Sequence, residues 1–433
     1  MPTELFQQSR NYEQFRCIGA ACEDTCCVGW QVSVDRATYD KYQACSHPVL
    51  RPRFDQLIQI QPDAANDKTY ARIVLEKSTC PFLSENLCSI QSELGEEYLS
   101  RTCATFPRIR HKVDNVIERS LDISCPEAAH LCLTEPGPAV FEQVKPEREE
   151  RHYVPESLPN PEPYFWEIRS AILSVLQNRA FPITKRLVLV GHMCSKLDEL
   201  SDSGRHATIP ETLEGFAFGI NAGFYDTHLR ECSADAVDQL STILELMTAR
   251  IKLDFVPERY LELYREFADG LRLKPGANFH DCGERYAHAY TYQYVPFMAT
   301  HEHMLEHYLV YYAYRTLFPF CPKPVGDGAD IKPALGRFTR EYMIMGAYFG
   351  IIRSTLIGLA ARHGLRFGVD QVIRCIQSSS RALEHCTSYP SQVLQILAGK
   401  GITSDARMSA LTQDPAVSRP TVSRGRAAGG SHK

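Results

Sequence analysis

The feature that most constrains this chain is a dense group of cysteines near its start. Four cysteines lie between Cys17 and Cys27, and ten of the sixteen fall in the first 132 residues. Thiols this close together are typical of a disulfide framework or a metal centre. Adjacent cysteines such as Cys26 and Cys27 rarely bridge each other, whereas one tight loop can gather several thiolates around a metal. The spacing therefore predicts a cysteine-rich metal-binding domain, which we place at residues 1–134.

The compartment decides between disulfides and metal, because reducing conditions keep thiols free. The first fifteen residues contain no basic segment followed by an apolar one, as a secretory signal would. No apolar run approaches the ~20 residues of a membrane helix; the nearest, Ile351 to Ala361, contains Arg353. We therefore expect a cytoplasmic protein without a membrane span. The net charge of -5 gives no basic bias, so nucleic acid is not an expected partner.

The rest of the chain divides by composition. Residues 135–163 are rich in proline and glutamate and predict a linker. Residues 164–402 predict a helical domain. Residues 403–433 are expected to be a disordered tail, because the last stretch, 415–433, is rich in Ser, Gly and Ala and cannot bury enough apolar surface to fold.

Apolar residues recur at three- and four-residue spacing in long segments without internal proline, which predicts helices. These segments are 165–178, 236–252, 257–273, 300–318, 337–363 and 369–386. Strand patterns are few and all lie in the cysteine region, at 30–34, 70–75 and 116–121. The predicted fold class is mainly α, with a small irregular cysteine-rich N-terminal domain followed by a larger helical domain.

Three blocks of the cysteine region resemble the flagellin lysine-N-methylase family, part of a wider group of cysteine-rich zinc- or iron-chelating domains. They begin FRCIGAACEDTCCVGW, CPFLSENLCSI and ERSLDISCPEAAHLCL, and the resemblance covers residues 12–133, with a weaker echo at 306–320. It implies an enzyme of the bacterial flagellum that methylates lysine side chains of flagellin, with S-adenosylmethionine as donor. The alternative is a non-catalytic metal-binding or assembly module that chelates iron or zinc.

The family's cysteine pattern falls on eight positions here: Cys17, Cys22, Cys26, Cys27, Cys80, Cys88, Cys103 and Cys125. Eight thiols are enough for one four-ligand centre with spares or for two metal sites. Soft thiolates dominate, and the nearest histidines, His47 and His111, are each isolated, which favours a 4Fe-4S cluster, with zinc as the alternative. The spacing does not choose the four ligands.

A radical mechanism requires C-x3-C-x2-C, but after Cys22 and Cys26 the third position is Gly29. We therefore expect direct transfer of the methyl group to a neutral lysine amine, with the metal centre structural or sensory. No glycine-rich nucleotide-binding turn follows a strand, so the donor site would be atypical. The glycines Gly215, Gly219 and Gly223, spaced by four, are expected to mark close helix packing.

Candidate residues for the reaction lie outside the cysteine pattern. Tyrosines between Tyr286 and Tyr314 could line a lysine channel through cation–π contacts, although packing is their commoner role. Within this stretch His303 and His307 lie one helical turn apart as a possible metal pair, but exposed polar positions on an amphipathic helix are the simpler interpretation. Trp30 is expected to cover the metal loop. The candidates for catalysis are Tyr290, Tyr294, Tyr308 and Glu306, and those for the donor's carboxylate are Arg108 and Arg110.

Overall fold

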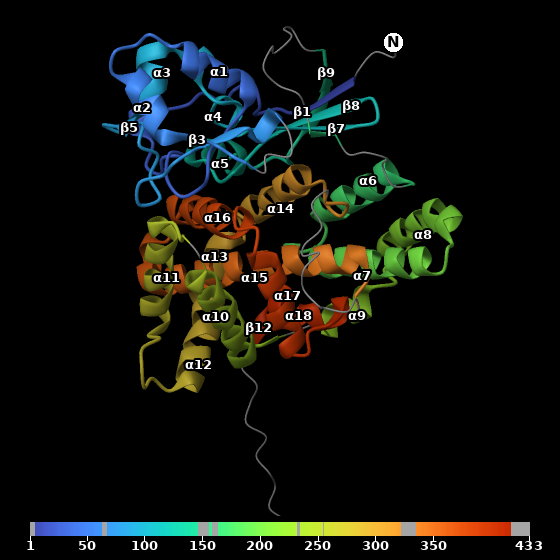
Figure 1. Cartoon of the computed structure of the whole chain (residues 1–433). Coiled ribbons are helices and arrows are strands. Elements are labelled where there is room, and N and C mark those ends of the chain that lie inside the picture. The colour runs from blue at the N-terminus through green and yellow to red at the C-terminus, as the bar shows by residue number, and fades with distance from the viewer. Residues whose placement is uncertain are drawn as a thin grey trace, which may run out of the picture.

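Helices dominate the architecture, as the spacing of apolar residues predicts. The computed structural model describes residues 5–62, 67–145, 156–157, 163–231, 234–253, 255–321 and 335–416. The N-terminal region lies over one end of the helical part, with α14, α16 and α6 along the border between them (Figure 1). The helices of the N-terminal region are α1 (Arg36–Ala44), α2 (Leu50–Leu57), α3 (Ser89–Leu94), α4 (Arg101–Thr105) and α5 (Pro126–Leu133).

The helical part contains the remaining helices. They are α6 (Phe165–Leu176), α7 (Ile183–Asp202), α8 (Ile209–Asn221), α9 (Asp226–Glu231), α10 (Ala236–Lys252), α11 (Glu258–Leu271), α12 (Phe279–Ala289), α13 (Val295–Met298), α14 (His303–Thr316), α15 (Arg337–His363), α16 (Val369–Glu384), α17 (Tyr389–Gly399) and α18 (Asp405–Thr412). A π-helical turn, Tyr290–Tyr294, joins α12 to α13. All six predicted helical segments are confirmed as α6, α10, α11, α14, α15 and α16.

A mixed five-stranded sheet in the N-terminal region corrects the expectation of an irregular domain. Its strand order is β10-β7-β8-β1-β9, with bounds β1 (Leu5–Ser9), β7 (Arg108–Val113), β8 (Val116–Leu121), β9 (Phe141–Val144) and β10 (Glu156–Ser157). β8 confirms the strand predicted at 116–121. The partner strands have the sequences RIRHKV (β7) and LFQQS (β1). Both contain several polar residues, so neither shows the run of apolar and β-branched residues that would predict a strand. β9 and β10 fall within the predicted linker.

A second, smaller core lies around the cysteines. A three-stranded sheet, β2 (Ser33–Val34), β4 (Ala71–Ile73) and β3 (Ile58–Ile60), and the hairpin β5 (Leu83–Ser84) and β6 (Leu87–Cys88) surround it. Tyr42 stacks on Phe54 with ring centroids 4.2 Å apart, and Phe82 completes this aromatic group. The core is separate from the main hydrophobic core, which contains residues of both the large sheet and the helices.

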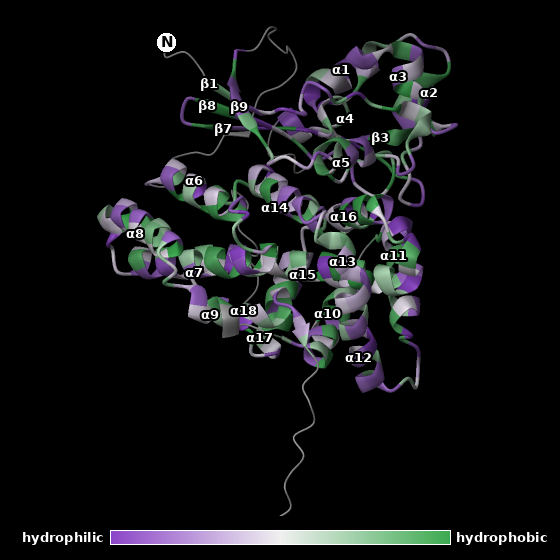
Figure 2. Ribbon diagram, turned by 180° about the vertical axis from the view of Figure 1, so that it is seen from behind, coloured by the Kyte–Doolittle hydropathy of each residue, from purple (hydrophilic) through white to green (hydrophobic). Residues whose placement is uncertain are grey.

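Helix α15 forms the centre of the main core. It lies in the middle of the helical part, with α7, α10, α11 and α18 packed around it (Figure 2). Within the part of the chain that the structure describes, residues Arg337–Arg366 are long and apolar enough to cross a membrane, but the apolar window is completely buried inside the fold. Such burial is typical of a core helix.

Two other expectations can be compared with the structure. Helix α18 and the short strand β12 (Pro415–Ala416) lie in the first part of the stretch predicted as a tail, and residues 417–433 lie outside the described residues. The prediction of close packing at the four-spaced glycines is wrong for Gly215, because a Cβ there would have nothing within 4 Å. Gly223 instead adopts a positive φ of 76°, which favours glycine at the end of α8.

Candidate functional site

The backbone brings distant cysteines together around the loop of residues 22–29. The Cys80 amide donates to the carbonyl of Cys27 at 2.8 Å, and Gly29 donates to Ser78 at 2.8 Å. Cys88 is paired with Leu83 across the β5–β6 hairpin, and the Leu83 amide donates to the Cys80 carbonyl at 3.0 Å. Two segments that are far apart in sequence, the loop of residues 22–29 and residues 78–88, therefore present thiols to one small core.

Four of these thiols influence one another directly. Burial, together with the neighbouring thiols Cys88, Cys27 and Cys80, raises the pKa of Cys103 to about 12. Burial likewise raises the pKa of Cys80 to about 12, with added contributions from Cys27 and Cys88. Cys27, Cys80, Cys88 and Cys103 therefore form one neighbourhood in which a thiolate needs a compensating positive charge.

The other four predicted cysteines, Cys17, Cys22, Cys26 and Cys125, form a second group of neighbouring thiols. Burial raises the pKa of Cys125 to about 12, with Cys22 and Asp122 as charged neighbours. Burial also raises the pKa of Cys22, and Cys17 is one of its neighbours. Cys26 has Cys125 as a neighbour, and it connects the two groups because it also lies beside Cys27 and Cys103.

Cys26 and Cys27 share a hydrogen bond between their side chains, so they titrate as a pair. This bond lowers the pKa of Cys27 to about 7, assisted by Thr25 and the positive charge of Arg381. The same bond and burial raise the pKa of Cys26. The pair therefore releases its first proton more readily than a free thiol and holds the second one more tightly.

The donor set fits the metals predicted from the sequence, because every candidate ligand is a soft thiol and all fifteen described cysteines are free. Among the residues that the structure describes, no group of three or more His, Cys, Asp or Glu side chains is arranged so that it could hold a metal ion. A centre would require the thiols to lie closer together around a metal than they do in this arrangement.

Trp30 lies next to this loop and makes contacts with both regions. Its ring meets Phe106 edge-on with centroids 4.8 Å apart and lies 5.1 Å from the His385 ring. The guanidinium of Arg381 lies 5.3 Å from the Trp30 ring centroid, a cation–π distance. Trp30 therefore packs between Phe106 of the N-terminal region and Arg381 and His385 at the end of α16. That it covers a metal stays a prediction.

A buried network of charged groups lies beside Cys125. Arg315 pairs with both Asp122 (3.2 Å) and Glu384 (3.3 Å), and His385 lies 3.1 Å from Asp122. Burial alone would raise the pKa of Asp122, but His385 and Arg315 hold it well below its usual range. Burial raises the pKa of Glu384 to about 7, since Arg315 opposes this effect only in part and the charge of Asp122 adds to it. Tyr308, one of the predicted catalytic residues, is fully buried beside Glu384.

We expect Glu384 to make stability fall as the pH rises. Because its folded pKa lies above the usual value, its contribution is complete below about pH 4.5 and is lost as the pH passes about 7. One proton limits the slope to about 1.4 kcal/mol per pH unit. Glu384→Gln should remove this slope in urea unfolding between about pH 5 and pH 8. The exposed Glu258→Gln is the control, and an unchanged slope in Glu384→Gln would contradict the assignment.

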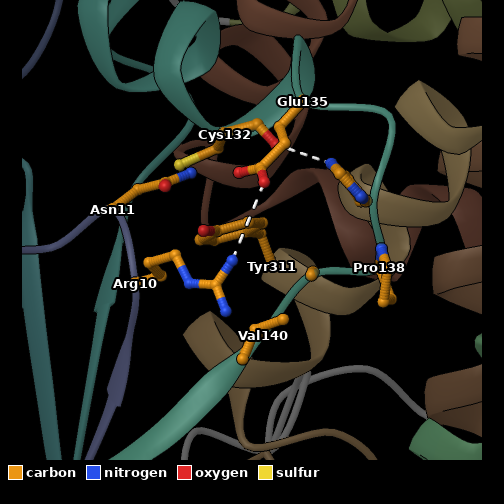
Figure 3. Close-up of a pocket in the computed structure, with 9 residues that line it drawn as sticks. Arg10, Asn11, Cys132, Glu135, Pro138, Val140 and Tyr311 are labelled. Carbon is orange, nitrogen blue, oxygen red and sulfur yellow. Dashed lines mark hydrogen bonds and ion pairs between the residues drawn. The ribbon is translucent and has the colours of Figure 1, made fainter.

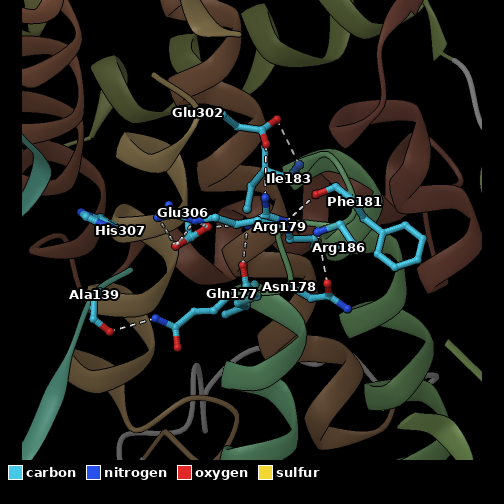
Figure 4. A network of polar contacts seen from close by, with 12 residues as sticks. Ala139, Gln177, Asn178, Arg179, Phe181, Ile183, Arg186, Glu302, Glu306 and His307 are labelled. Carbon is cyan, nitrogen blue, oxygen red and sulfur yellow. Dashed lines mark hydrogen bonds and ion pairs between the residues drawn. The ribbon is translucent and has the colours of Figure 1, made fainter. Parts of the chain in front are cut away.

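Glu306, another predicted catalytic residue, is buried in a network of arginines. Its carboxylate pairs with Arg186 at 2.6 Å and with Arg179 at 2.8 Å, and Arg186 also reaches Glu302 at 3.3 Å (Figure 4). Arg179 donates further to the carbonyls of Pro136 and Gly137. These contacts attach the segment after α5 to α14 and account for Glu306 as a structural residue.

The histidines beside Glu306 correct two interpretations of the sequence. His307 is buried rather than exposed, and its two ring nitrogens each lie 2.7 Å from a carbonyl oxygen, of Cys132 and of Gly137. Both nitrogens are therefore engaged and are not available to form a metal pair with His303. Burial, together with His307 and His301, lowers the pKa of His303 to about 4.

The remaining tyrosine candidates surround a buried arginine. Arg353 lies 5.0 Å from the Tyr290 ring centroid and 5.9 Å from that of Tyr294, and it pairs with Asp414 at 2.6 Å. The rings of Tyr290 and Tyr294 stack on each other within the π-helical turn. These contacts favour packing over a lysine channel at this position.

The two arginines predicted for the donor's carboxylate lie against an aromatic pair. Arg110 is 5% exposed and donates to the hydroxyl of Tyr12 at 2.7 Å. Arg108 donates to the carbonyl of Phe15 at 3.1 Å and lies over the Phe15 ring. Their contacts are with the N-terminal segment, and binding of a carboxylate by them stays a prediction.

Two hollows differ greatly in size. The first, between Asn11, Cys132 and Tyr311, has about 10 Å³ of free space, which is room for one water molecule (Figure 3). The second is a groove of about 600 Å³ between α10 and α17, lined by Leu244, Glu245, Thr248, Ala249, Lys252, Leu253, Gln392 and Ile396. Its volume lies in the range of small-molecule sites. The residues lining this groove carried no recognisable signal in the sequence.

Comparison with known proteins identifies similar sequences. Residues 169–411, more than half of the chain, match the family described as the FliB lysine N-methylase C-terminal domain. A stretch of 135 residues is 36% identical to the flagellar biosynthetic protein FliU of Salmonella muenchen and covers 30% of this chain and 78% of that protein.

Two proteins named lysine-N-methylase are also similar. The one from Salmonella typhimurium is 36% identical over 127 residues, and the one from Salmonella choleraesuis is 36% identical over 126 residues. Each alignment covers 28% of this chain and 31% of the relative, so the matched stretch spans about a third of those two proteins. No solved structure matches this chain.

Proposed function

Because this chain belongs to the FliB lysine N-methylase family, we propose that it transfers methyl groups to lysine side chains of flagellin, with S-adenosylmethionine as the donor. The observation that carries the proposal is the family match over residues 169–411. The names of the relatives link them to the flagellum and to lysine methylation. These names are consistent with a flagellar protein as the substrate, and we propose that it is methylated in the cytoplasm.

The proposed chemistry is a direct displacement. The lysine nitrogen attacks the methyl carbon, a nitrogen–carbon bond forms, and the carbon–sulfur bond of the sulfonium breaks and leaves a neutral thioether. The amine must be neutral when it attacks, and the proton that it releases must pass to a base or to water. Positioning of the two reactants supplies much of the rate acceleration in such a transfer.

We also propose that the cysteine region holds a 4Fe-4S cluster, with zinc as the alternative. Support comes from the two groups of neighbouring thiols around Cys26, which gather the eight predicted cysteines from four segments. Such a centre would supply a fixed cross-link between these segments. Cys26 and Cys27 favour it because the hydrogen bond between their side chains lowers the pKa of Cys27, which eases formation of a thiolate ligand.

The expected metal content of the protein purified without oxygen is about four irons per chain with a broad visible absorbance band. We assign Cys22 and Cys26 as two of the four ligands, so Cys22→Ala and Cys26→Ala should each lose both the iron and the absorbance band. Cys386→Ser is the matched control, since Cys386 lies in the helical part and outside the predicted pattern. Zinc without a visible band would replace the cluster by a structural zinc site, and retention of iron in both alanine variants would contradict the ligand assignment.

Methyl transfer is tested separately. Calorimetric titration with S-adenosylmethionine should show saturable binding, and incubation with flagellin should add methyl groups to lysines, detected by peptide mass spectrometry. Absence of donor heat, of a melting shift and of methylated lysine in metal-loaded protein would favour the other function, a metal-binding or assembly module without catalysis.

A further inference from the structure

We propose that helix α16 positions the cysteine loop and that Arg381 is the positioning residue for the metal centre. This inference rests on the cysteine-bound centre proposed above. It assigns a role in the chemistry of the N-terminal region to a helix that lies about 350 residues after the cysteine loop and within the FliB family match.

The contact between α16 and the cysteine region is made by three side chains spaced four residues apart: Gln377, Arg381 and His385. In an α-helix this spacing places residues on one face. Each of the three touches the loop of residues 24–30 or the segment of Asp122 and Ser124. One face of α16, extended by His385 just after its end, therefore contacts both the loop that carries Cys26 and the segment that carries Cys125.

Gln377 connects these two segments. Its amide nitrogen donates to Asp24 Oδ2 at 2.8 Å and to the carbonyl of Ser124 at 2.7 Å. Asp24 lies two residues before Cys26, and Ser124 directly precedes Cys125. Because Gln377 is 1% exposed, both bonds are shielded from competing water. The position of Cys26 relative to Cys125 is thus fixed through a side chain of the helical part.

Arg381 binds the loop backbone itself. Its Nη1 lies 2.5 Å from Asp24 Oδ1, its Nη2 donates to the carbonyl of Thr25 at 2.8 Å, and a further bond reaches the carbonyl of Val28. These acceptors flank Cys26 and Cys27 on both sides. The side chain is only 4% exposed, so ordering a planar guanidinium here fixes the loop at several points at once.

The positive charge of Arg381 also favours a centre that is built from thiolates. Its guanidinium is held on Asp24 and on the carbonyls of Thr25 and Val28, so its positive charge lies beside Cys26 and Cys27. The pairing with Asp24 leaves the guanidinium close to the loop, and a thiolate ligand needs such a positive neighbour in a buried place. A centre with several thiolates would therefore lose both geometry and charge compensation if Arg381 were replaced.

The test compares metal retention in three variants of the full chain purified without oxygen. Arg381→Met keeps the length of the side chain but removes the donors and the charge, and Arg381→Lys restores the charge alone. Gln377→Met provides a second variant that leaves Arg381 in place. The matched control is Arg374→Met, because Arg374 lies on the same helix and pairs with Glu266 instead of the loop.

We expect Arg381→Met to release its metal to a chelator about 10- to 100-fold more readily than the unmodified protein, the range seen when groups that orient metal ligands are removed. Arg381→Lys should fall between them, Gln377→Met should also lose metal more readily, and Arg374→Met should not. In metal-free protein, hydrogen exchange of the amides at 22–30 should be faster in Arg381→Met, while that of α15 is unchanged. Circular dichroism verifies folding, and Gln377→Met and Arg381→Lys provide the result if Arg381→Met does not fold.

The possible results separate the two proposals. If the unmodified protein binds metal and Arg381→Met retains it equally well with unchanged exchange of the loop, the role of α16 is overturned while the cysteine centre stands. If the unmodified protein binds no metal at all, the cysteine centre is overturned and the role of Arg381 toward it falls with it.

Discussion

Replacing Arg169 with methionine is expected to destabilise the fold by about 3–5 kcal/mol, the cost of leaving one partner of a buried ion pair alone. Arg169 pairs with Glu118 at 2.8 Å, and the two side chains are 2% and 3% exposed. The guanidinium also donates to the carbonyls of Ala313 and Phe318, both at 3.0 Å. It therefore joins β8 of the sheet to α6 and to the end of α14, and its loss leaves a carboxylate and two carbonyls in the core.

The free energy of unfolding in urea measures this effect. Burial raises the pKa of Glu118 even in the presence of Arg169. The loss of unfolding free energy in Arg169→Met should therefore be smaller at acidic pH, where the unpaired carboxyl takes up a proton. Arg265→Met is the control, because Arg265 and Glu258 form an exposed pair and should change stability by less than about 1 kcal/mol. Equal stability of the two variants would refute the importance of the buried pair.

Replacing Gly270 with alanine is expected to destabilise the protein by about 3 kcal/mol, at the upper end of what overpacking costs. A Cβ at Gly270 would lie 2.1 Å from the carbonyl oxygen of Gly358 and 3.0 Å from the amide nitrogen of Arg362. Both contacts are with the backbone of α15, which cannot rotate away as a side chain can. Helices α11 and α15 would have to separate.

The matched substitution is Gly215→Ala, which should have the opposite sign. Gly215 lies inside α8 and a Cβ there meets nothing within 4 Å, so alanine should stabilise the helix by about 0.5–1 kcal/mol. Thermal unfolding followed by circular dichroism measures both variants. A melting temperature of Gly270→Ala equal to that of the unmodified protein would show that α11 and α15 are not in close contact.

The helices could be predicted from the sequence because each buries one continuous stripe. The boundaries of α10 and α15 match the predicted segments, α14 is shorter than predicted by a few residues at each end, and α16 is shorter by two residues at its end. The large sheet could not be predicted in full, since β1 contains polar residues and β7 contains charged ones, several of which are buried in the structure. Arg110 in β7, for example, is buried because Tyr12 covers it.

Only the part of the site that is formed by residues close together in the sequence could be predicted. The clustering of cysteines is visible in the sequence because Cys17 to Cys27 lie on one loop, and the structure brings the distant cysteines beside them. The role of α16 has no sequence signal, because Gln377 and Arg381 are ordinary polar residues on a helix until the loop lies against them. The interpretation of His307 as an exposed polar residue was wrong, since its partners, the backbone carbonyls of Cys132 and Gly137, come from a segment that periodicity cannot place.

The division of the core has a consequence for how the protein loses its structure. The large sheet shares its hydrophobic core with the helices, whereas the group around Tyr42, Phe54 and Phe82 forms a core of its own. Units with separate cores can open independently. The small unit could therefore open and expose Cys80 and Cys103 while the sheet stays attached to the helices, so metal could be inserted or lost without global unfolding.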